Sequence, residues 1–243
     1  MNLPRLAVLA LAPVFLVSSA RADAQSEVWI AKARAYLGTE GALNAVHSMR
    51  ITGVIENERK EQIKAEFIFQ KPDQHLYTLS DGKLAQTTAL DGYDAWVRRQ
   101  DLVNPAAWQL TLLEKQQIKS MRANNAETLG FYRAVEKRGG RTEFLGDATA
   151  DGIDCVKIAF IYSPGIAFYR YFEKATGRLV MMQTEAGIIT REEGETIVNG
   201  IRFGKKLTNT TPNGATSTLA IETITLNEKF PAGQFAVPTV TVK

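Results

Sequence analysis

Short stretches of alternating apolar and polar residues dominate the chain from Met49 onward, and glycine, proline, aspartate or asparagine separates one stretch from the next. In residues 62–70 the alternation places Ile63, Phe67 and Phe69 on one side and mostly charged or amide side chains on the other. Because successive strand residues point to opposite faces of a sheet, this segment predicts a strand with one aromatic face.

Tight-turn signals recur between these stretches. Five pairs can supply the positive φ angles of short hairpins: Asp81-Gly82, Asp91-Gly92, Asp151-Gly152, Asn199-Gly200 and Asn213-Gly214. Parallel strands would need a helix between each strand and the next, and the chain has too few helical segments for that. We therefore predict a mainly β (α+β) fold built on an antiparallel meander.

Two segments have helical character. Residues 26–47 predict a helix that is capped by Ser26, broken near Gly38 and continued briefly to His47. A second helix is predicted from an Asn104 cap, with Pro105 at its first position, and it continues to residue 121 without a breaker.

The second predicted helix would be apolar on two sides. Leu110, Leu113 and Ile118 share one face at helical spacing, while Trp108 and Leu112 lie roughly opposite. A helix of this kind is either covered by another segment, such as residues 126–135, or lies as a lid over an apolar cavity. Trp108 and Leu112 are therefore candidate lid residues.

The amino-terminal residues have the pattern of a secretory signal peptide. Arg5 precedes an almost wholly apolar stretch at residues 6–17, and residues 20–22 read Ala-Arg-Ala, a small-x-small cleavage pattern. We expect residues 1–22 to be cleaved and residues 23–243 to form a single domain. No cysteine lies near the cleavage point, so the mature chain is expected to be a soluble periplasmic protein without a lipid anchor.

The charge of the chain excludes some partners. Loss of Arg5 and Arg21, with no acidic residue, would lower the formal net charge from +3 to +1. Lysine and arginine are scattered, and no interleaving of basic and aromatic residues suggests a nucleic-acid groove. We expect no nucleic-acid partner.

Catalytic and metal-binding patterns are scarce. The chain has two histidines, His47 and His75, and neither lies in a metal-binding or catalytic motif; His75 is early in a predicted strand, where it could face water. Cys155 is the only cysteine, and the expected state is a buried, inert thiol. The acidic run around Glu192 reads as a solvated strand edge or bulge. We expect no catalytic residues, no metal and no cofactor, and an enzyme is disfavoured.

Apolar alternation continues in the second half of the chain. Val156, Ile158, Phe160 and Tyr162 form one set, and either Leu179 with Met181 or Val180 with Met182 continues it. These residues either fill a core beneath a twisted sheet or line a cavity that a curved sheet encloses. The candidate cavity residues are Ile63, Phe67, Phe69, Phe160, Phe168 and Met181.

The order of several segments resembles the outer-membrane lipoprotein-sorting proteins of the LolA/LolB-like superfamily. The segments are AYLGTEGALNAVHSMRITG, FIFQKPDQHLYTLSDG, LDGYDAWVRR, TEFLGDATADGIDCVKIAF, IAFYRYFEKATGRLVMMQTE, NGIRFGKKL and LNEKFPAGQFAVP, and they span nearly the whole mature chain. The resemblance implies a strongly curved antiparallel sheet, an unclosed half-barrel, with helices packed in or over its concave face.

The resemblance also implies a function and some departures from it. Carriers of this superfamily shelter lipoprotein acyl chains, and many have an arginine that hydrogen-bonds the lid where this chain has Lys71, before Pro72. Lysine retains the charge but loses the planar fork, so Lys71 is a candidate lid residue with a less specific contact. Glu173 and Gly204 are further departures, at positions where an aspartate and a proline are common.

The leading hypothesis is a non-catalytic periplasmic carrier or binding protein for lipoprotein acyl chains or another apolar lipid. The resemblance implies an inner-membrane releasing complex and an outer-membrane acceptor as further partners. The alternative is an envelope sensor or protein-interaction module of the same fold, of the sigma-factor-regulator type.

Overall fold

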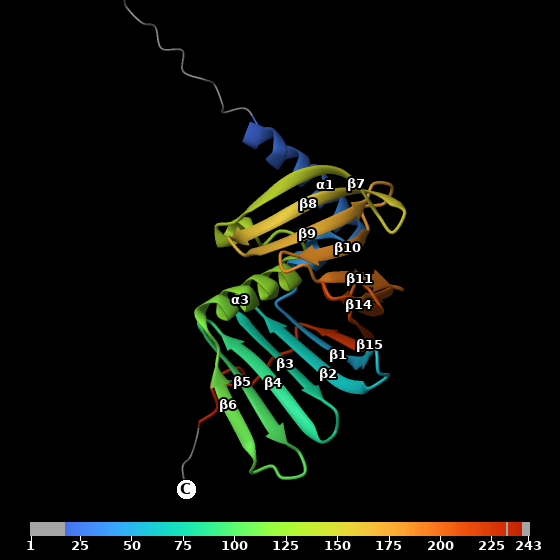
Figure 1. Cartoon of the computed structure of the whole chain (residues 1–243). Coiled ribbons are helices and arrows are strands. Elements are labelled where there is room, and N and C mark those ends of the chain that lie inside the picture. The colour runs from blue at the N-terminus through green and yellow to red at the C-terminus, as the bar shows by residue number, and fades with distance from the viewer. Residues whose placement is uncertain (1–17, 232, 240–243) are drawn as a thin grey trace, which may run out of the picture.

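A computed structural model describes residues 18–231 and 233–239 (Figure 1). The predicted signal peptide, residues 1–22, lies outside the described residues except for its last five. The helical elements are α1 (Ser18–Leu37), α2 (Glu40–Asn44), α3 (Lys115–Gly130) and the 3₁₀ turn η1 (Glu136–Arg138). The strands of the first half are β1 (Ser48–Asn57), β2 (Gln62–Gln70), β3 (Gln74–Ser80), β4 (Leu84–Asp91), β5 (Asp94–Asp101) and β6 (Trp108–Leu112). Those of the second half are β7 (Arg141–Ala150), β8 (Ile153–Ser163), β9 (Ile166–Glu173), β10 (Leu179–Thr184), β11 (Ile189–Glu193), β12 (Thr196–Val198), β13 (Ile201–Phe203), β14 (Lys206–Thr210) and β15 (Thr216–Leu226).

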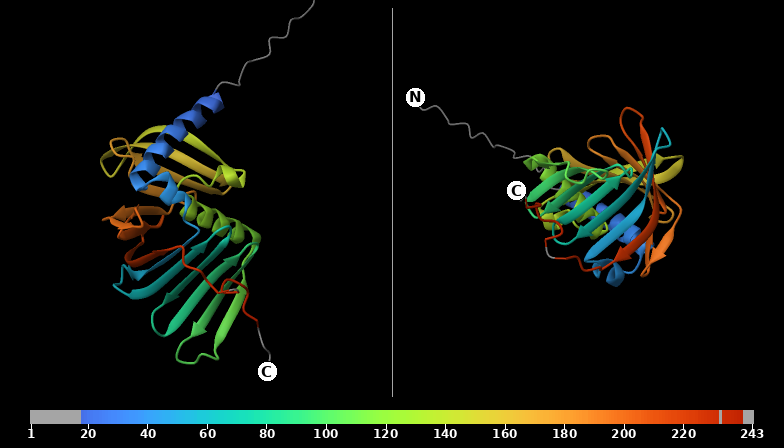
Figure 2. Two further views of the ribbon diagram at one scale, coloured as in Figure 1. Left: turned by 180° about the vertical axis from the view of Figure 1, so that it is seen from behind. Right: turned by 90° about the horizontal axis from the view of Figure 1, so that it is seen from below.

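One antiparallel sheet of 13 strands dominates the described part of the chain, in the order β6-β5-β4-β3-β2-β1-β15-β14-β11-β10-β9-β8-β7. The sheet bends strongly, so that β1–β6 form one arm and β7–β11 the other, and the edge strands β6 and β7 do not pair (Figures 1 and 2). A small hairpin, β12–β13, stands apart from it. The prediction of a mainly β fold with a curved, unclosed sheet is confirmed.

The predicted hairpin chemistry is visible in the backbone angles. Asp151 and Gly152 have φ of 51° and 77°, and Asn199 and Gly200 have φ of 50° and 79°. Two successive residues with positive φ make the type I′ turn that suits the twist of paired strands. The first pair connects β7 to β8 and the second connects β12 to β13.

Helix α1 begins earlier than predicted, but it ends at the predicted break near Gly38. Ser26 does not cap α1, because the helix begins at Ser18 and the Ser26 side chain is fully buried within it. The break at Gly38 is confirmed, and α2 follows with Thr39 as its cap, whose hydroxyl oxygen accepts from Ala42 N at 3.2 Å. A Cβ at Gly38 would lie 2.7 Å from the Gly200 carbonyl oxygen, so glycine permits this close approach.

The predicted helix from Asn104 is wrong. Residues 108–112 form β6, in which Trp108 lies opposite Gln100 and Leu112 lies opposite Trp96 of β5. The helix starts later, at Lys115, where Gln117 Oε1 accepts from the Glu114 backbone N–H at 3.0 Å. Pairing with β5 therefore outweighs the helical spacing of the apolar residues.

The two helices cover different arms of the concave face. Ile30 and Ala33 of α1 pack on β8 and β9 residues that include Phe160 and Phe172. Helix α3 contacts β2, β3 and β4 and lies between the arms in Figure 1. The helices therefore fill much of the concavity without filling all of it.

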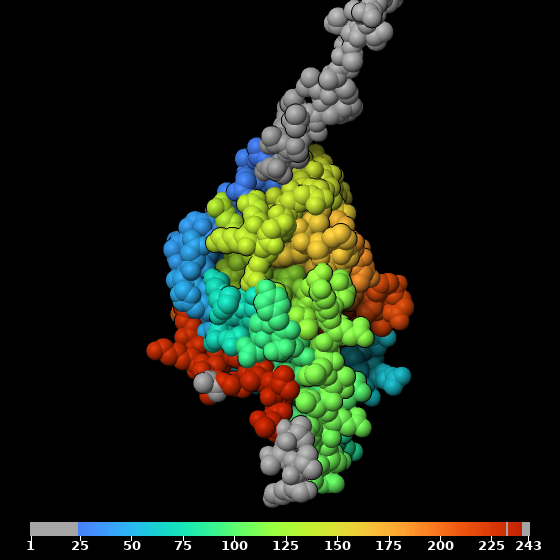
Figure 3. Space-filling model, turned by 90° about the vertical axis from the view of Figure 1, so that its left-hand side faces the viewer, coloured from blue at the N-terminus to red at the C-terminus, as the bar shows by residue number. Residues whose placement is uncertain are grey.

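The convex face has its own cover. The segment that follows β15 runs along the outside of the first arm (Figure 3), where Phe235 packs against Ile68, Leu76 and Trp96. The Trp96 indole N–H donates to the Phe235 carbonyl oxygen at 3.0 Å. On the second arm, Cys155 is fully buried, as expected, and burial raises the pKa of its thiol.

Candidate ligand-binding cavity

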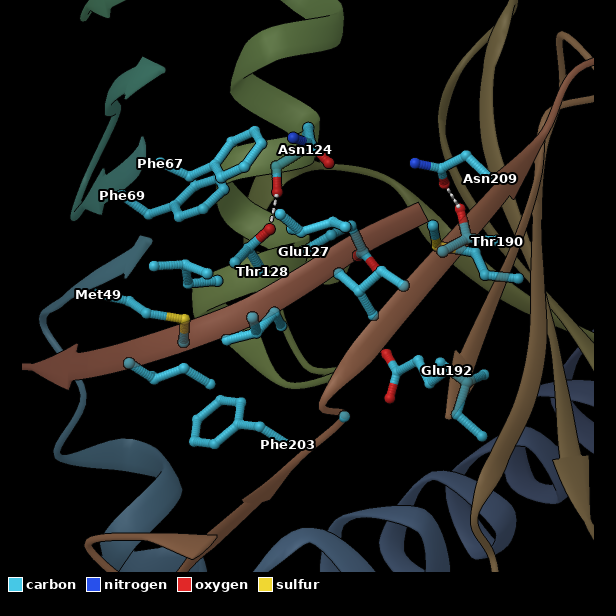
Figure 4. A pocket seen from close by; sticks show the side chains of 18 of the residues that line it. Met49, Phe67, Phe69, Asn124, Glu127, Thr128, Thr190, Glu192, Phe203 and Asn209 are labelled. Carbon is cyan, nitrogen blue, oxygen red and sulfur yellow. Dashed lines mark hydrogen bonds between the residues drawn. The ribbon is translucent and has the colours of Figure 1, made fainter. Parts of the chain in front are cut away.

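A cavity of about 550 Å³ lies between the concave face of the sheet and α3 (Figure 4). That volume falls within the range of about 300–1,000 Å³ that is usual for small-molecule sites. Strands of both arms contribute lining residues, as do α3 and the segment after it. The lining side chains include Met49, Ile51, Phe67, Phe69, His75, Glu127, Phe168, Arg170, Met182, Thr190, Glu192, Leu207 and Asn209.

The wall on the first arm is apolar and aromatic. Alternate residues of β1 and β2 face the cavity, among them Met49, Ile51, Phe67 and Phe69, and Ile51 lies directly opposite Phe67 across the two strands. The Phe69 ring stacks on the imidazole of His75, with 4.4 Å between the ring centroids. This wall offers van der Waals contact and no charge.

His75 belongs to this wall, and the expectation that it faces water is wrong. It is 4% exposed, and neither ring nitrogen has a hydrogen-bond partner among the described residues. Burial lowers the pKa of its imidazole to about 4, because a charged ring would lose its hydration without gaining a partner. The side chain is therefore neutral at pH 7 and packs as an aromatic residue.

A polar row crosses the opposite wall. Ser217 of β15 lies opposite Asn209 of β14, Asn209 opposite Thr190 of β11, and Thr190 opposite Met182 of β10. The Thr190 hydroxyl donates to Asn209 Oδ1 at 2.7 Å (Figure 4), so the Asn209 side chain is held toward the cavity. Met182 in turn lies opposite Arg170, which ends the row on β9.

Arg170 is neutralised within the wall. Its guanidinium pairs with Glu127 of α3, and the Tyr162 hydroxyl donates to the same carboxylate at 2.5 Å. The guanidinium also lies over the Phe160 and Tyr132 rings, 4.5 Å and 5.0 Å from their centroids. The carboxylate and the aromatic faces hold the guanidinium in place, although its Nε has no hydrogen-bond partner among the described residues, and the pair fixes α3 to the second arm.

A second fastening holds α3 to the first arm, at the corner between β2 and β3. Asp73 accepts from Arg122 of α3 at 2.8 Å and from Arg138 of η1 at 2.8 Å. The side-chain amide of Asn125, also on α3, donates to the Gln70 carbonyl oxygen at 3.2 Å. These contacts hold the helix over the cavity.

Lys71 contacts a different segment from the one that the resemblance suggests. Its ammonium donates to the Val46 carbonyl oxygen, just beyond α2, at 2.6 Å. Desolvation, with the charges of Lys137 and Arg34 nearby, lowers the pKa of Lys71. Residues 71–73 form the turn between β2 and β3, and it is Asp73 that reaches α3.

The structure separates the predicted cavity residues into two groups. Phe67, Phe69 and Phe168 line the cavity. The other three do not: Ile63 lies further along β2, Phe160 is fully buried under α1, and Met181 packs in the outer cluster that contains Cys155.

The position of Met181 has a clear cause. The pairing of β9 with β10 shifts register between Leu179 and Met181, so Leu179 and Met182 both line the cavity. A bulge of this kind breaks the alternation on which the sequence-based choice depended. Each of the two predicted pairs, Leu179 with Met181 and Val180 with Met182, therefore contains one residue that lines the cavity.

The predicted lid residues Trp108 and Leu112 lie on the edge strand β6, where they are 38% and 64% exposed. They are not among the residues that line the cavity. The helix that covers the cavity is α3, and it begins after them.

One side chain of the acidic run lines the cavity and is also exposed, in keeping with the prediction of a solvated run. Glu192 of β11 shares the concave face with Thr190 and points into the cavity (Figure 4). The protein atoms around the cavity partly desolvate its carboxyl group and raise its pKa, against the opposing charges of Arg170 and Arg178, although the side chain remains exposed to the open cavity. Its strand partner is Leu207, and a smaller adjoining pocket places it beside Arg178, Arg202 and Gly204.

Two further properties concern the described residues only. No group of three or more histidine, cysteine, aspartate or glutamate side chains is arranged there to hold a metal ion. No helix within residues 18–231 or 233–239 has the length and apolar character needed to cross a membrane.

The comparisons with known proteins show the fold. No family model matches the chain, and no curated protein sequence matches it. A solved LolA superfamily protein from Nitrosomonas europaea is similar in structure, with a TM-score of 0.55, 12% identity and coverage of 87% of this chain and 97% of that one. A domain from Vibrio parahaemolyticus, classed with the outer membrane lipoprotein-sorting proteins, gives a TM-score of 0.52, 13% identity and coverage of 87% and 97%. A DUF1329 family protein from Desulfovibrio piger gives a TM-score of 0.51 and 11% identity, with coverage of 86% of this chain and 96% of that one.

Proposed function

We propose, on the premise of this LolA-like fold, that the chain is a periplasmic carrier or binding protein for an acyl chain or a similar apolar lipid. The observation that carries the proposal is the cavity of about 550 Å³, whose first-arm wall is made of apolar and aromatic side chains. The name of the Vibrio parahaemolyticus relative, which refers to lipoprotein sorting, supports the same kind of cargo.

Burial of an acyl chain in this cavity would provide a substantial driving force. Each buried methylene contributes about 0.8 kcal/mol, so ten methylenes contribute on the order of 8 kcal/mol before the costs of ordering and opening are subtracted. The Phe67 and Phe69 rings offer the surface for this contact. No covalent step is needed, and the cargo leaves when the cavity opens.

Helix α3 is the element that would open. It is held to one arm through Asp73 and to the other through the Arg170–Glu127 pair. If one of these two ion pairs breaks, α3 can move away from that arm while the other ion pair still holds it to the second one. We propose that an inner-membrane releasing complex loads the chain and that an outer-membrane acceptor receives its cargo.

The experiment that tests this function is the identification of bound lipid. The chain is expressed with its own leader, purified from the periplasmic fraction, extracted with organic solvent and examined by mass spectrometry. Titration with a fluorescent fatty acid then measures binding. We expect co-purifying lipid and a saturable titration; the absence of both would overturn the proposal.

A matched pair of variants tests whether the cavity is the binding site. Leu207 of β14 lines the cavity, whereas the adjacent Lys206 is exposed and points to the other face of the strand. Leu207→Trp should fill part of the cavity and reduce binding. Lys206→Trp adds an indole to the same strand outside the cavity and should leave binding unchanged. Equal effects of the two variants would contradict the assignment.

A further inference from the structure

One carboxylate in the cavity wall has no partner among the described residues. Glu192 takes part in no hydrogen bond and no ion pair there, although it points into the cavity beside Thr190 and opposite Leu207 (Figure 4). The Glu192 side chain is exposed to the open cavity, so water reaches its carboxylate there. A purely apolar cargo would displace that water and leave the carboxylate without a donor, which is unfavourable.

The cationic side chains near Glu192 are already engaged. Arg170 is paired with Glu127, and Arg202 of β13 is paired with Glu195. Each pair neutralises its own charge, so neither guanidinium is available in full to Glu192. The carboxylate of Glu192 is the uncompensated charge of this wall.

The remaining titratable groups around the cavity do not supply a positive charge. Arg178, in the turn after β9, pairs with Glu173 at 3.4 Å. His75 is neutral on the opposite wall, and burial and the nearby Glu192 charge raise the pKa of Tyr132, so its phenol is also neutral. A ligand is the remaining source of a counter-charge.

The cavity is therefore polarised from one arm to the other. Thr190, Asn209 and Ser217 give hydrogen-bonding capacity to the wall that contains Glu192, whereas Phe67 and Phe69 make the opposite wall aromatic. An amphiphile matches this arrangement when its chain lies against the aromatic wall and its head group lies at the polar row.

We propose that the ligand is an amphiphile with a protonated amine in its head group, which pairs with Glu192. This inference rests on the proposed function and narrows its ligand class. A charge-assisted hydrogen bond between an ammonium group and a carboxylate is shorter and stronger than a neutral one. An anionic head group in the same place would be repelled by Glu192.

The test compares three ligands that share a ten-carbon chain and differ in head group: decylamine, decanoic acid and decanol. Each is titrated into the mature chain by calorimetry at pH 7.4, below its micelle-forming concentration. We expect decylamine to bind about tenfold or more tightly than decanoate, which corresponds to a hydrogen bond to a charged group. Equal affinity, or tighter binding of decanoate, would overturn the inference.

Variants assign the preference to Glu192. Glu192→Gln should weaken decylamine by about tenfold and leave decanol within about twofold, because only the charge is removed. Glu193→Gln removes a carboxylate at the adjacent position, on the other face of β11, and should change neither ligand. Retention of the amine preference in Glu192→Gln would overturn the assignment.

The outcomes separate this inference from the proposed function. If all three ligands bind with the same affinity, the lipid-binding function stands and the head-group inference fails. If none of them binds to the wild-type chain, the proposed function fails and the inference fails with it.

Discussion

Arg122 of α3 donates two hydrogen bonds to one carboxylate oxygen of Asp73, at 3.2 Å from Nε and 2.8 Å from Nη2. Asp73 is 7% exposed and follows the Lys71-Pro72 corner, so a short turn of the sheet carries the fastening of the helix that covers the cavity. Arg138 pairs with the same carboxylate. Two cations therefore share one acid at this point.

Replacement of Asp73 by asparagine should loosen α3. The variant keeps the side-chain shape but leaves Arg122 and Arg138 without their counter-charge, so we expect a loss of about 1–3 kcal/mol in the free energy of unfolding. Ligand release should become faster, because the closed position of α3 is weakened. Urea unfolding and stopped-flow displacement of a fluorescent fatty acid measure the two effects.

Asp147→Asn is the matched control for Asp73→Asn. Asp147 pairs with Lys174, but its side chain is 75% exposed, and such pairs contribute little to stability. An Asp73→Asn variant with the wild-type release rate would show that the corner does not govern opening.

Replacement of Lys71 by leucine should alter ligand release more than stability. The lysine makes one hydrogen bond, to the Val46 carbonyl oxygen, and its side chain is otherwise largely exposed. Lys71→Arg should behave like the wild type if a donor to that carbonyl is what matters. A release rate in Lys71→Leu equal to that of the wild type would leave Lys71 with no role in the cover.

His75 should make the fold sensitive to mild acid. Its folded pKa of about 4 lies below the ordinary value of 6.5, so the unfolded chain binds the proton first as the pH falls. Stability is fully present above pH 6.5 and is lost progressively between about 6.5 and about 4, by up to about 3 kcal/mol. Urea unfolding at a series of pH values measures this slope.

His75→Phe should remove most of that slope, because phenylalanine fills the same aromatic stack without a titrating group. His47→Gln removes the exposed histidine and should leave the slope as in the wild type. If His75→Phe and wild type lose stability in parallel, the buried imidazole is not the cause.

Glu192 should make the folded state less stable as the pH rises, which is the opposite of the effect of His75. Burial raises its folded pKa, and Arg170 and Arg178 oppose that shift only in part, with Tyr132 and Arg202 the other titratable groups nearby. A raised carboxyl pKa favours the folded state below the unfolded value, and this contribution is lost as the pH rises through the folded pKa. Glu192→Gln should therefore gain stability relative to the wild type at pH 8 and lose that gain in acid.

Protonation of Glu192 should also change the affinity for an amine ligand. Decylamine binding should weaken as the pH falls through the Glu192 pKa, because protonation removes the charge that the ammonium group meets. Decanol binding should not follow that titration. Parallel pH profiles for the two ligands would contradict the role of Glu192.

Local pattern was sufficient to predict much of the sheet. Alternation identified Phe67 and Phe69 as residues of one face, and the Asp151-Gly152 turn was apparent from its two residues. Both depend on interactions within a few residues, and these are the interactions that a single sequence expresses directly.

Two errors have a common physical source in the pairing of consecutive strands. Trp108 and Leu112 fit helical spacing and strand alternation equally well over five residues, and the pairing with β5 decided between them. Met181 was misplaced because a bulge against β9 interrupts the alternation. Glu192 is exposed, as the polar run around it predicts, but the sequence does not show that it lies on the face of β11 that lines the cavity.

The pairing of β1 with β15 has a consequence for the order of folding. Met49 lies opposite Leu226, so the first and last strands of the sheet are neighbours and together join its two arms. The strand that completes the centre of the sheet is therefore the last to leave the ribosome. Contacts over so large a separation along the chain slow the folding rate, because the loop must close before the contacts can form. The arms can acquire local structure early, but the binding cavity between them cannot exist until β15, which supplies part of its lining, has been made.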